Sequence, residues 1–159
     1  MTTFDIHTHS VSSGHGTKDT VSDMLREASR RGLHTLGISE HGPAILNAPK
    51  PSYFRSLSFA PRKRFGIRVL YGAEVNILDG GKLDLEDDIL SGLDYVIASM
   101  HHPSHRYGDR VSNTDDYIKA MSDDNVRILG HCDNTQFPVD YDAIVSSAKQ
   151  YSVIVEINE

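Results

Sequence analysis

The chain has 159 residues, 38% of them hydrophobic, which is enough for one domain with a hydrophobic core, so we expect a single domain over residues 1–159. Its formal net charge is −6 and its Lys and Arg are scattered, so it lacks the basic stripe typical of nucleic-acid binding. One Cys excludes an intramolecular disulfide, and neither a signal peptide nor a membrane span is recognisable, so we expect a cytoplasmic protein.

Short apolar or β-branched runs alternate with amphipathic stretches, which is the pattern of strands alternating with helices in a parallel sheet. Six runs are predicted strands: residues 3–7, 35–38, 68–75, 95–99, 126–129 and 153–157. The pattern therefore predicts an α/β fold.

Three helices are indicated by their capping residues and apolar spacing. The first begins after Thr20, an N-cap that pairs with Asp23 three positions on, and it ends before Gly32. Thr114 is the expected N-cap of the second helix. The apolar spacing of residues 142–149 predicts the third.

A proline-rich stretch over residues 43–61 interrupts the alternation and is predicted to be a long irregular loop that leads into a short helix near Arg62. Such loops often carry substrate contacts. Basic residues flank it: Arg55, Arg62, Lys63 and Arg64. We expect a solvated basic surface here, in which Arg62 is the residue suited to hold a substrate phosphate in a forked contact.

Histidines and one glutamate recur at, or just after, the carboxyl ends of the predicted strands. They are His7, His9, His41, Glu74, His101, His102 and His131. The carboxyl ends of parallel strands open onto one face, so these side chains should converge there. His7 and His9 add a local argument, because residues two apart on an extended segment point to the same side and can grip one ion together.

The types of side chain in this set favour divalent metal ions. Imidazole and carboxylate suit Zn, Mn or Fe. The near absence of Cys argues against a closed structural zinc site and favours an open catalytic one. Glu74 is the candidate bridge between two ions, and paired ions generate hydroxide near neutral pH and neutralise the charge of a phosphoryl transition state.

Five segments carry a family resemblance: residues 5–10 with His15 downstream, 38–43, 72–76, 99–103 and 129–131. An HxH motif with a further histidine, followed by the other segments in this order, is similar to the polymerase and histidinol phosphatase (PHP) family, in particular its small bacterial phosphoesterase branch. The resemblance covers the whole chain. It implies a distorted seven-stranded (β/α)7 barrel with up to three metal ions.

The resemblance also implies ligands for each ion. One ion would lie on His7, His9 and Glu74, a second on Glu74, His101 and His131, and a third on His15 and His41. The implied catalytic residues are Glu74, His101 and His131. The family's last motif, an Asp-x-His after the final strand, does not follow the sixth predicted strand. We therefore expect an incomplete barrel of six strands, truncated before the last strand.

The remaining histidines and the cysteine have other interpretations. Adjacent strand-end residues face opposite ways, so His101 and His102 cannot both be ligands. The resemblance favours His101, and His102 is then a contact to substrate or to a metal ligand. His34 begins a strand at its amino end, away from the site. His105 lies in a polar loop, where we expect exposure to solvent. Cys132 is expected to be a small buried residue.

The predicted function is cleavage of small phosphate esters by attack of metal-bound hydroxide at a multinuclear centre. The alternative is a metal-binding module with little or no turnover, because two expected ligands are absent from this chain. Hydrolysis of carbon–nitrogen or carbon–oxygen bonds is a third reading. Open barrel edges predict self-association.

Overall fold

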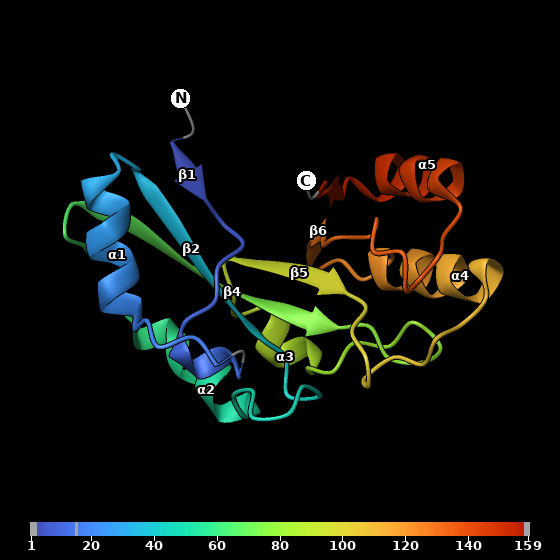
Figure 1. Ribbon diagram of the computed structural model, residues 1–159, viewed down its shortest axis with the longest axis horizontal. Coiled ribbons are helices and arrows are strands. Elements are labelled where there is room, and N and C mark those ends of the chain that lie inside the picture. The colour runs from blue at the N-terminus through green and yellow to red at the C-terminus, as the bar shows by residue number, and fades with distance from the viewer. Residues whose placement is uncertain (1–2, 15, 158–159) are drawn as a thin grey trace.

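Seven strands form one sheet in the computed structural model, which describes residues 3–14 and 16–157. Six run parallel in the order β1, β2, β4, β5, β6, β7, and the short β3 pairs antiparallel with β4. Their bounds are β1 Phe4–Asp5, β2 Thr35–His41, β3 Lys63–Arg64, β4 Ile67–Asn76, β5 Tyr95–Ser99, β6 Val126–Leu129 and β7 Ile154–Val155. The sheet curls into a half-barrel (Figure 1), which confirms the predicted α/β fold and its incomplete barrel.

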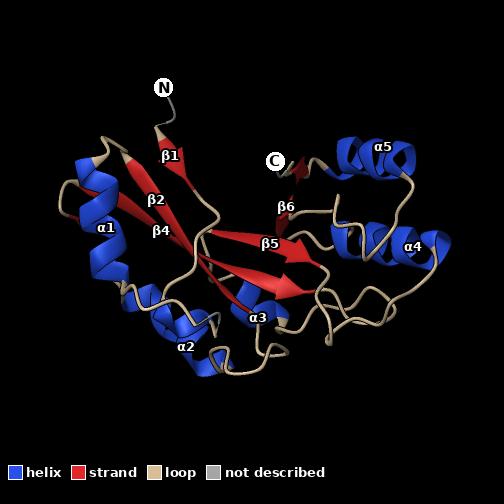
Figure 2. Ribbon diagram, in the orientation of Figure 1, coloured by secondary structure: helices blue, strands red, loops and turns tan. Residues whose placement is uncertain are grey.

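Five α-helices and two 3-10 turns connect the strands of the described chain. They are η1 Val11–Ser13, α1 Val21–Arg30, α2 Pro51–Ser56, η2 Leu57–Phe59, α3 Asp87–Leu90, α4 Arg110–Met121 and α5 Tyr141–Tyr151. α1 packs beside β2 and β4, while α4 and α5 lie side by side at the other end of the sheet (Figure 2). None of these helices is long and apolar enough to cross a membrane.

The central strands β2, β4 and β5 are buried along most of both faces, as expected for a parallel sheet that other elements cover. Ile38 of β2, Val75 of β4 and Ile97 of β5 are fully buried. All six predicted strands are present. β1 and β7 are shorter than predicted, because each lies at an edge of the described sheet and pairs with one neighbour.

The first helix begins as its sequence predicts. The Thr20 hydroxyl accepts a hydrogen bond from the Asp23 backbone N–H at 3.2 Å, and the Asp23 carboxylate accepts one from the Thr20 N–H at 3.2 Å. These reciprocal bonds form a capping box. The chain leaves α1 through Gly32, whose φ of +78° is in the left-handed region that favours glycine.

The second helix begins earlier than predicted. Asp109, not Thr114, is the N-cap of α4, and its carboxylate accepts from the Ser112 backbone N–H at 2.8 Å. Thr114 lies inside the helix, where its hydroxyl donates to the Arg110 carbonyl at 2.6 Å. Both residue types cap helices well, so the loop that brings the chain to Arg110 decides between them. The third helix matches, since α5 contains residues 142–149.

The proline-rich loop contains a helix where none was predicted. α2 begins at Pro51, a residue that fits the first turn of a helix because its missing N–H is not needed there. The predicted helix near Arg62 is absent. Lys63 and Arg64 form β3 instead, because the chain reverses at residues 65–66 and pairs back onto β4.

Candidate metal centre

Five histidines and Glu74 meet where the parallel strands end. His41 ends β2, Glu74 is near the end of β4, His101 follows β5, His131 follows β6, and His7 and His9 follow β1. The strands are parallel, so their carboxyl ends share one edge of the sheet. The structure therefore brings together six of the predicted metal-binding side chains.

Glu74 is the centre of this cluster and is 1% exposed. Its Oε1 faces Nε2 of three rings, at 3.3 Å from His7, 3.4 Å from His101 and 2.9 Å from His131. Its Oε2 lies 3.2 Å from His9 Nε2 and 2.9 Å from His41 Nδ1. Neighbouring ring centroids are 4.5 to 6.1 Å apart in the closed order His7, His9, His41, His101, His131. This set of donors suits divalent ions.

The electrostatics of the cluster favour bound positive charge. Burial raises the pKa of Glu74, but hydrogen bonds from the histidines overcome this effect and hold the pKa well below its ordinary value. Burial lowers the pKa of His7, yet hydrogen bonds to Glu156 and Glu74 raise it to about 10. The pKa of His131 is raised by Glu74 against the same effect of burial. Protons, or metal cations in their place, neutralise the carboxylates, so the cluster fits a divalent metal.

Three rings form a hydrogen bond through Nδ1, on the side of the ring away from Glu74, so that Nε2 points toward Glu74. The contacts are His7 Nδ1 to Glu156 Oε1 at 2.8 Å, His9 Nδ1 to Ser13 Oγ at 2.8 Å and His101 Nδ1 to Asn76 Oδ1 at 2.9 Å. Outer hydrogen bonds of this kind orient a ring and fix its tautomer. Sequence reasoning missed all three partners, although Asn76 and Glu156 lie in or beside predicted strands.

Two sets of three side chains among the described residues bring one ligand atom each within 4.8 Å of one another: His7, His9 and Glu74, and His41, Glu74 and His101. The first set is the one that the resemblance implies. In the second, His41 takes the place expected for His131. His15, the other expected ligand beside His41, lies outside the described residues. The assignment of ligands to individual ions therefore stays a prediction.

The turn that carries His131 is constrained by its neighbours. A Cβ at Gly130 would lie 2.3 Å from Ser99 Oγ and 2.9 Å from Ile97 Cγ2, so a larger residue here would have to displace these two side chains. His131 has a φ of +31°, which is unusual for a residue with a side chain. The Glu156 carboxylate accepts its N–H at 3.0 Å and holds this conformation. Strain of this kind is often retained at functional sites.

A pocket of about 310 Å³ lies beside the cluster. His41, His101, His102 and Phe137 are part of its lining. The exposed His102 ring stacks on Tyr107, with centroids 4.7 Å apart and planes 7° apart. His102 is thus placed beside the cluster without joining it, and its role as a substrate contact stays a prediction.

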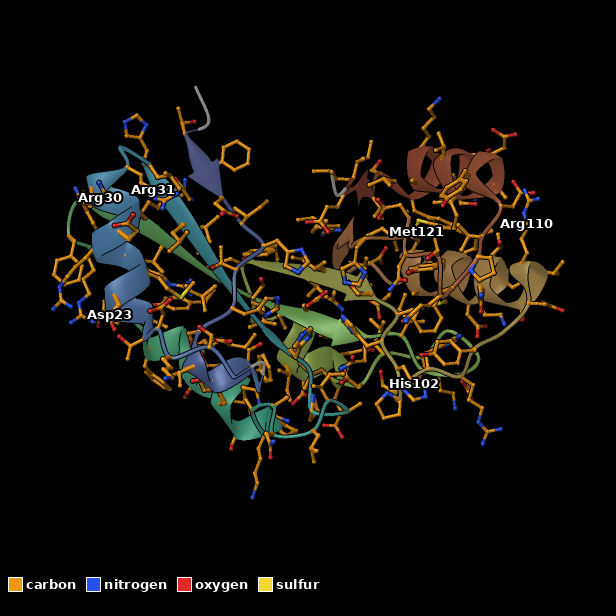
Figure 3. All side chains as sticks on the ribbon, viewed as in Figure 1. Asp23, Arg30, Arg31, His102, Arg110 and Met121 are labelled. Carbon is orange, nitrogen blue, oxygen red and sulfur yellow. The ribbon has the colours of Figure 1, made fainter. Side chains whose placement is uncertain are left out.

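A larger groove of about 700 Å³ lies between α1 and the β1 edge, lined by side chains that include Phe4 and Met24. Histidine is absent from its described lining. Arg30 and Arg31 at the end of α1 lie on the opposite side of the molecule from His102 (Figure 3). This groove is therefore separate from the histidine cluster.

His105 is buried, which corrects the expectation that it is exposed. It is 2% exposed, its ring packs edge-on against Phe137, and its backbone N–H donates to the His101 carbonyl at 2.8 Å. The polar loop after β5 folds back on itself, and this contact is invisible in the sequence. Cys132 is buried, as predicted, and His34 lies directly before β2 at its amino end, away from the cluster, as predicted.

Arg62 lies at the other end of the sheet, which corrects its predicted place beside substrate phosphate. It forms an ion pair with Asp94, the residue before β5, and its guanidinium lies 5.5 Å from the centre of the Tyr71 ring. Its carbonyl accepts from the Val69 N–H at 3.0 Å near the start of β4. The predicted loop ends at the amino ends of the strands, whereas the histidines lie at the carboxyl ends.

Comparisons with known proteins match nearly the whole chain. The sequence profile described as PHP domain matches residues 5–158. Proteins of Clostridium acetobutylicum and Clostridium novyi, both named probable phosphatases, are 42% and 41% identical over 155 residues. Each match covers 97% of this chain and 63% of the relative. The chain thus spans somewhat less than two thirds of the length of these relatives.

Two solved structures share the fold. A Listeria monocytogenes protein described as a histidinol phosphatase has a TM-score of 0.61 and 18% identity, over 93% of this chain and 76% of that one. The histidinol phosphate phosphatase of Lactococcus lactis subsp. lactis, solved with zinc, L-histidinol and phosphate, has a TM-score of 0.56 and 17% identity, over 98% of this chain and 73% of that one.

Proposed function

The chain belongs to the PHP family, and on that premise we propose that it is a metal-dependent hydrolase that cleaves phosphate esters at a centre of several divalent ions. One observation carries the proposal: Glu74 is buried among five imidazoles at the edge where the parallel strands end. The names of the clostridial relatives support the same class of reaction.

The residues of the cluster have distinct parts in this proposal. Glu74 belongs to both sets of converging ligand atoms, so it is suited to be shared between ions. Bound ions would supply Lewis acidity, an activated water molecule and positive charge toward the phosphoryl group. The implied catalytic residues are Glu74, His101 and His131. The remaining metal-binding residues are His7, His9, His15 and His41.

We propose a small phosphorylated substrate. The pocket of about 310 Å³ is at the low end of the usual range for ligand sites, roughly 300–1,000 Å³. The phosphoryl group would face His41 and His101, while the organic part would pass His102 and Phe137. Neither Lys nor Arg is among the described lining residues, so the charge of the phosphate is left to the metal centre. The small ligands of the Lactococcus complex support this size class.

Metal analysis of the purified chain, combined with a screen of phosphomonoesters and phosphodiesters, tests the proposal. We expect bound Zn, Mn or Fe, up to three ions for each chain, and hydrolysis that chelation abolishes and added metal restores. Zinc is the first ion to try, because the Lactococcus complex contains it. A chain that neither holds metal nor takes up added Zn or Mn refutes the proposal, and activity that survives chelation indicates another mechanism.

A metal-binding module with little turnover is the second candidate. It is supported by the coverage of the relatives, since the chain matches 63% of their length. In this case residues 1–159 are one part of a PHP domain, and ligands from outside them are needed for full activity. Metal binding without hydrolysis of any ester in the screen supports this candidate, and efficient turnover rejects it.

Two further proposals concern the surroundings of the chain. β1 and β7 are edge strands of the described sheet, and Phe4 and Ile154 on them are 53% and 64% exposed, which suits pairing with a second copy. Light scattering measures this association, and a monomer at all concentrations contradicts it.

A cytoplasmic location, supported by the single and unpaired Cys132, is tested by imaging the tagged protein in cells.

A further inference from the structure

We propose that Asn76 is a positioning residue that fixes the tautomer and orientation of His101, so that His101 presents Nε2 to the metal centre. The inference rests on the proposed function, because it gives the Asn76 side chain a part in building the metal site. Asn76 ends β4 two residues after Glu74, so the two side chains point to the same face of the strand. It is fully buried.

The direction of the Asn76 amide is set by two acceptors. Its Nδ2 donates to Asp84 Oδ2 at 2.6 Å and to the Gly42 carbonyl at 3.2 Å. A carboxylate and a carbonyl accept hydrogen bonds and cannot donate them. A flipped amide would place Oδ1 against both acceptors, which is unfavourable in a buried site. The Nδ2 atom must therefore face Asp84 and Gly42, and Oδ1 must face the other way.

The fixed Oδ1 then determines which nitrogen of His101 carries the proton. Oδ1 lies 2.9 Å from His101 Nδ1, and an amide oxygen only accepts, so Nδ1 must be the donor. In the neutral ring Nε2 then holds a lone pair. This Nε2 lies 3.4 Å from Glu74 Oε1, in the set formed with His41. Asn76 thus selects the one neutral form of His101 that can bind metal at this atom.

Asp84 anchors the amide from the other side. Its Oδ1 accepts from the Asn76 backbone N–H at 2.9 Å, and its Oδ2 accepts from the Ala44 N–H at 2.9 Å. The carboxylate also lies against Gly42, where a Cβ would be 2.2 Å from Oδ1, so the turn after β2 needs glycine. Asp84 therefore ties the end of β4 to the loop after β2, and it keeps the Asn76 amide from rotating.

Asn76→Asp is the critical variant. It keeps the size of the side chain and an oxygen for His101 Nδ1, but it removes both donor N–H groups and places a carboxylate against Asp84. We expect the side chain to turn away from Asp84 and zinc affinity to fall about 10–100-fold, the usual effect of losing an outer partner of a metal ligand. A competing chelator dye measures the affinity.

Two further variants separate positioning from general damage. In Asn76→Asp combined with Asp84→Asn, the two side chains form a donor–acceptor pair again, but the Gly42 carbonyl loses its donor and the Ala44 N–H loses its acceptor, so only part of the zinc affinity should return. Asn125→Asp is the matched control, because Asn125 Nδ2 donates to Asp123 Oδ1 at 3.0 Å just before β6, away from the cluster. We expect this control to change zinc affinity by less than about twofold, since it touches no ring of the cluster.

Histidine ring 15N–1H correlation spectra of the full chain give a readout that is independent of activity. Zinc-loaded wild type should show His101 protonated at Nδ1, and so should metal-free protein at mildly alkaline pH. A His101 ring with no proton on Nδ1 overturns the proposal even if a variant fails to fold. Unchanged zinc affinity in folded Asn76→Asp, or an equal loss in Asn125→Asp, also overturns it. A chain that binds no zinc refutes the proposed function, while the spectrum of the metal-free protein still decides the tautomer.

Discussion

The two ends of the sheet both gather charged side chains, with different results. At the amino end, Arg62 and Asp94 neutralise each other in a pair that is 46% and 28% exposed, and Asp94 also accepts from the Tyr71 N–H at 2.7 Å. At the carboxyl end, Glu74 is buried and faces five ring nitrogens. The Arg62–Asp94 pair is neutral and partly solvated, so it joins two segments of the chain. The buried Glu74 carboxylate, together with several ring nitrogens that face it, is suited to bind cations.

Among the variants considered for the two ends of the sheet, Glu74→Gln should reduce metal binding the most. A neutral amide cannot balance two divalent ions, so we expect metal at both sets of ligands to be lost together, with affinity reduced by more than about 100-fold. Elemental analysis after dialysis measures the loss. Glu27→Gln, on the exposed face of α1, is the matched control and should keep its metal. Loss of one ion with full retention of the others would contradict a shared Glu74.

Glu156→Gln should have the next largest effect. Burial lowers the pKa of His7, but Glu156 and Glu74 raise it to about 10. Below that pH zinc must displace a proton from His7, so wild-type affinity should rise with pH until about pH 10. Removing the Glu156 charge lowers the pKa of His7. The increase of zinc affinity with pH should therefore end at a lower pH, and zinc binding should release fewer protons.

Calorimetry in two buffers of different ionisation enthalpy counts the protons released in the Glu156→Gln comparison. The variant should also bind zinc about 10-fold more weakly, because His7 loses its charged outer partner. Glu86→Gln is the control, since Glu86 is an exposed residue whose partner is Arg55. Equal proton release from wild type and Glu156→Gln would show that Glu156 does not tune His7.

His102→Ala tests the pocket at the carboxyl end. His102 is part of the pocket lining, and a contact between one aromatic ring and the organic part of a substrate is worth about 1 kcal/mol, or roughly fivefold in binding. We expect KM for a small phosphate ester to rise by about that factor, with little change in kcat. Steady-state kinetics measure both. His34→Ala, at the amino end of β2, should change neither, and a fall in kcat alone would place His102 in the chemical step.

Arg62→Ala should have the smallest effect. The ion pair with Asp94 is partly exposed, so its loss should lower the free energy of unfolding by less than about 1 kcal/mol. Metal content, KM and kcat should stay at wild-type values, because Arg62 lies at the amino end of the sheet. Thermal unfolding and kinetics of the same preparation check both expectations. A raised KM would show that Arg62 reaches the substrate after all.

Sequence and structure agree where a single segment contains the whole signal. The capping box of α1 joins Thr20 and Asp23 three residues apart, so neither depends on the rest of the fold. The start of α4 could not be predicted from its own segment. Asp109 and Thr114 both suit an N-cap, and the loop that precedes the helix selects Asp109. His105 shows the same limit, because its burial comes from a loop that folds back against Phe137.

Local patterns in the sequence were enough to predict the six parallel strands and the convergence of the histidines with Glu74, because apolar runs indicate strands and parallel strands place their carboxyl ends on one edge. The hydrogen-bond partners of the ring Nδ1 atoms, in contrast, depend on how distant segments pack together. Glu156 reaches His7 across 149 positions of sequence, and Asn76 reaches His101 across 25. The curl of the sheet brings β7 near the segment after β1, whereas the pairing of β4 with β5 places Asn76 near His101, and no local pattern encodes either contact.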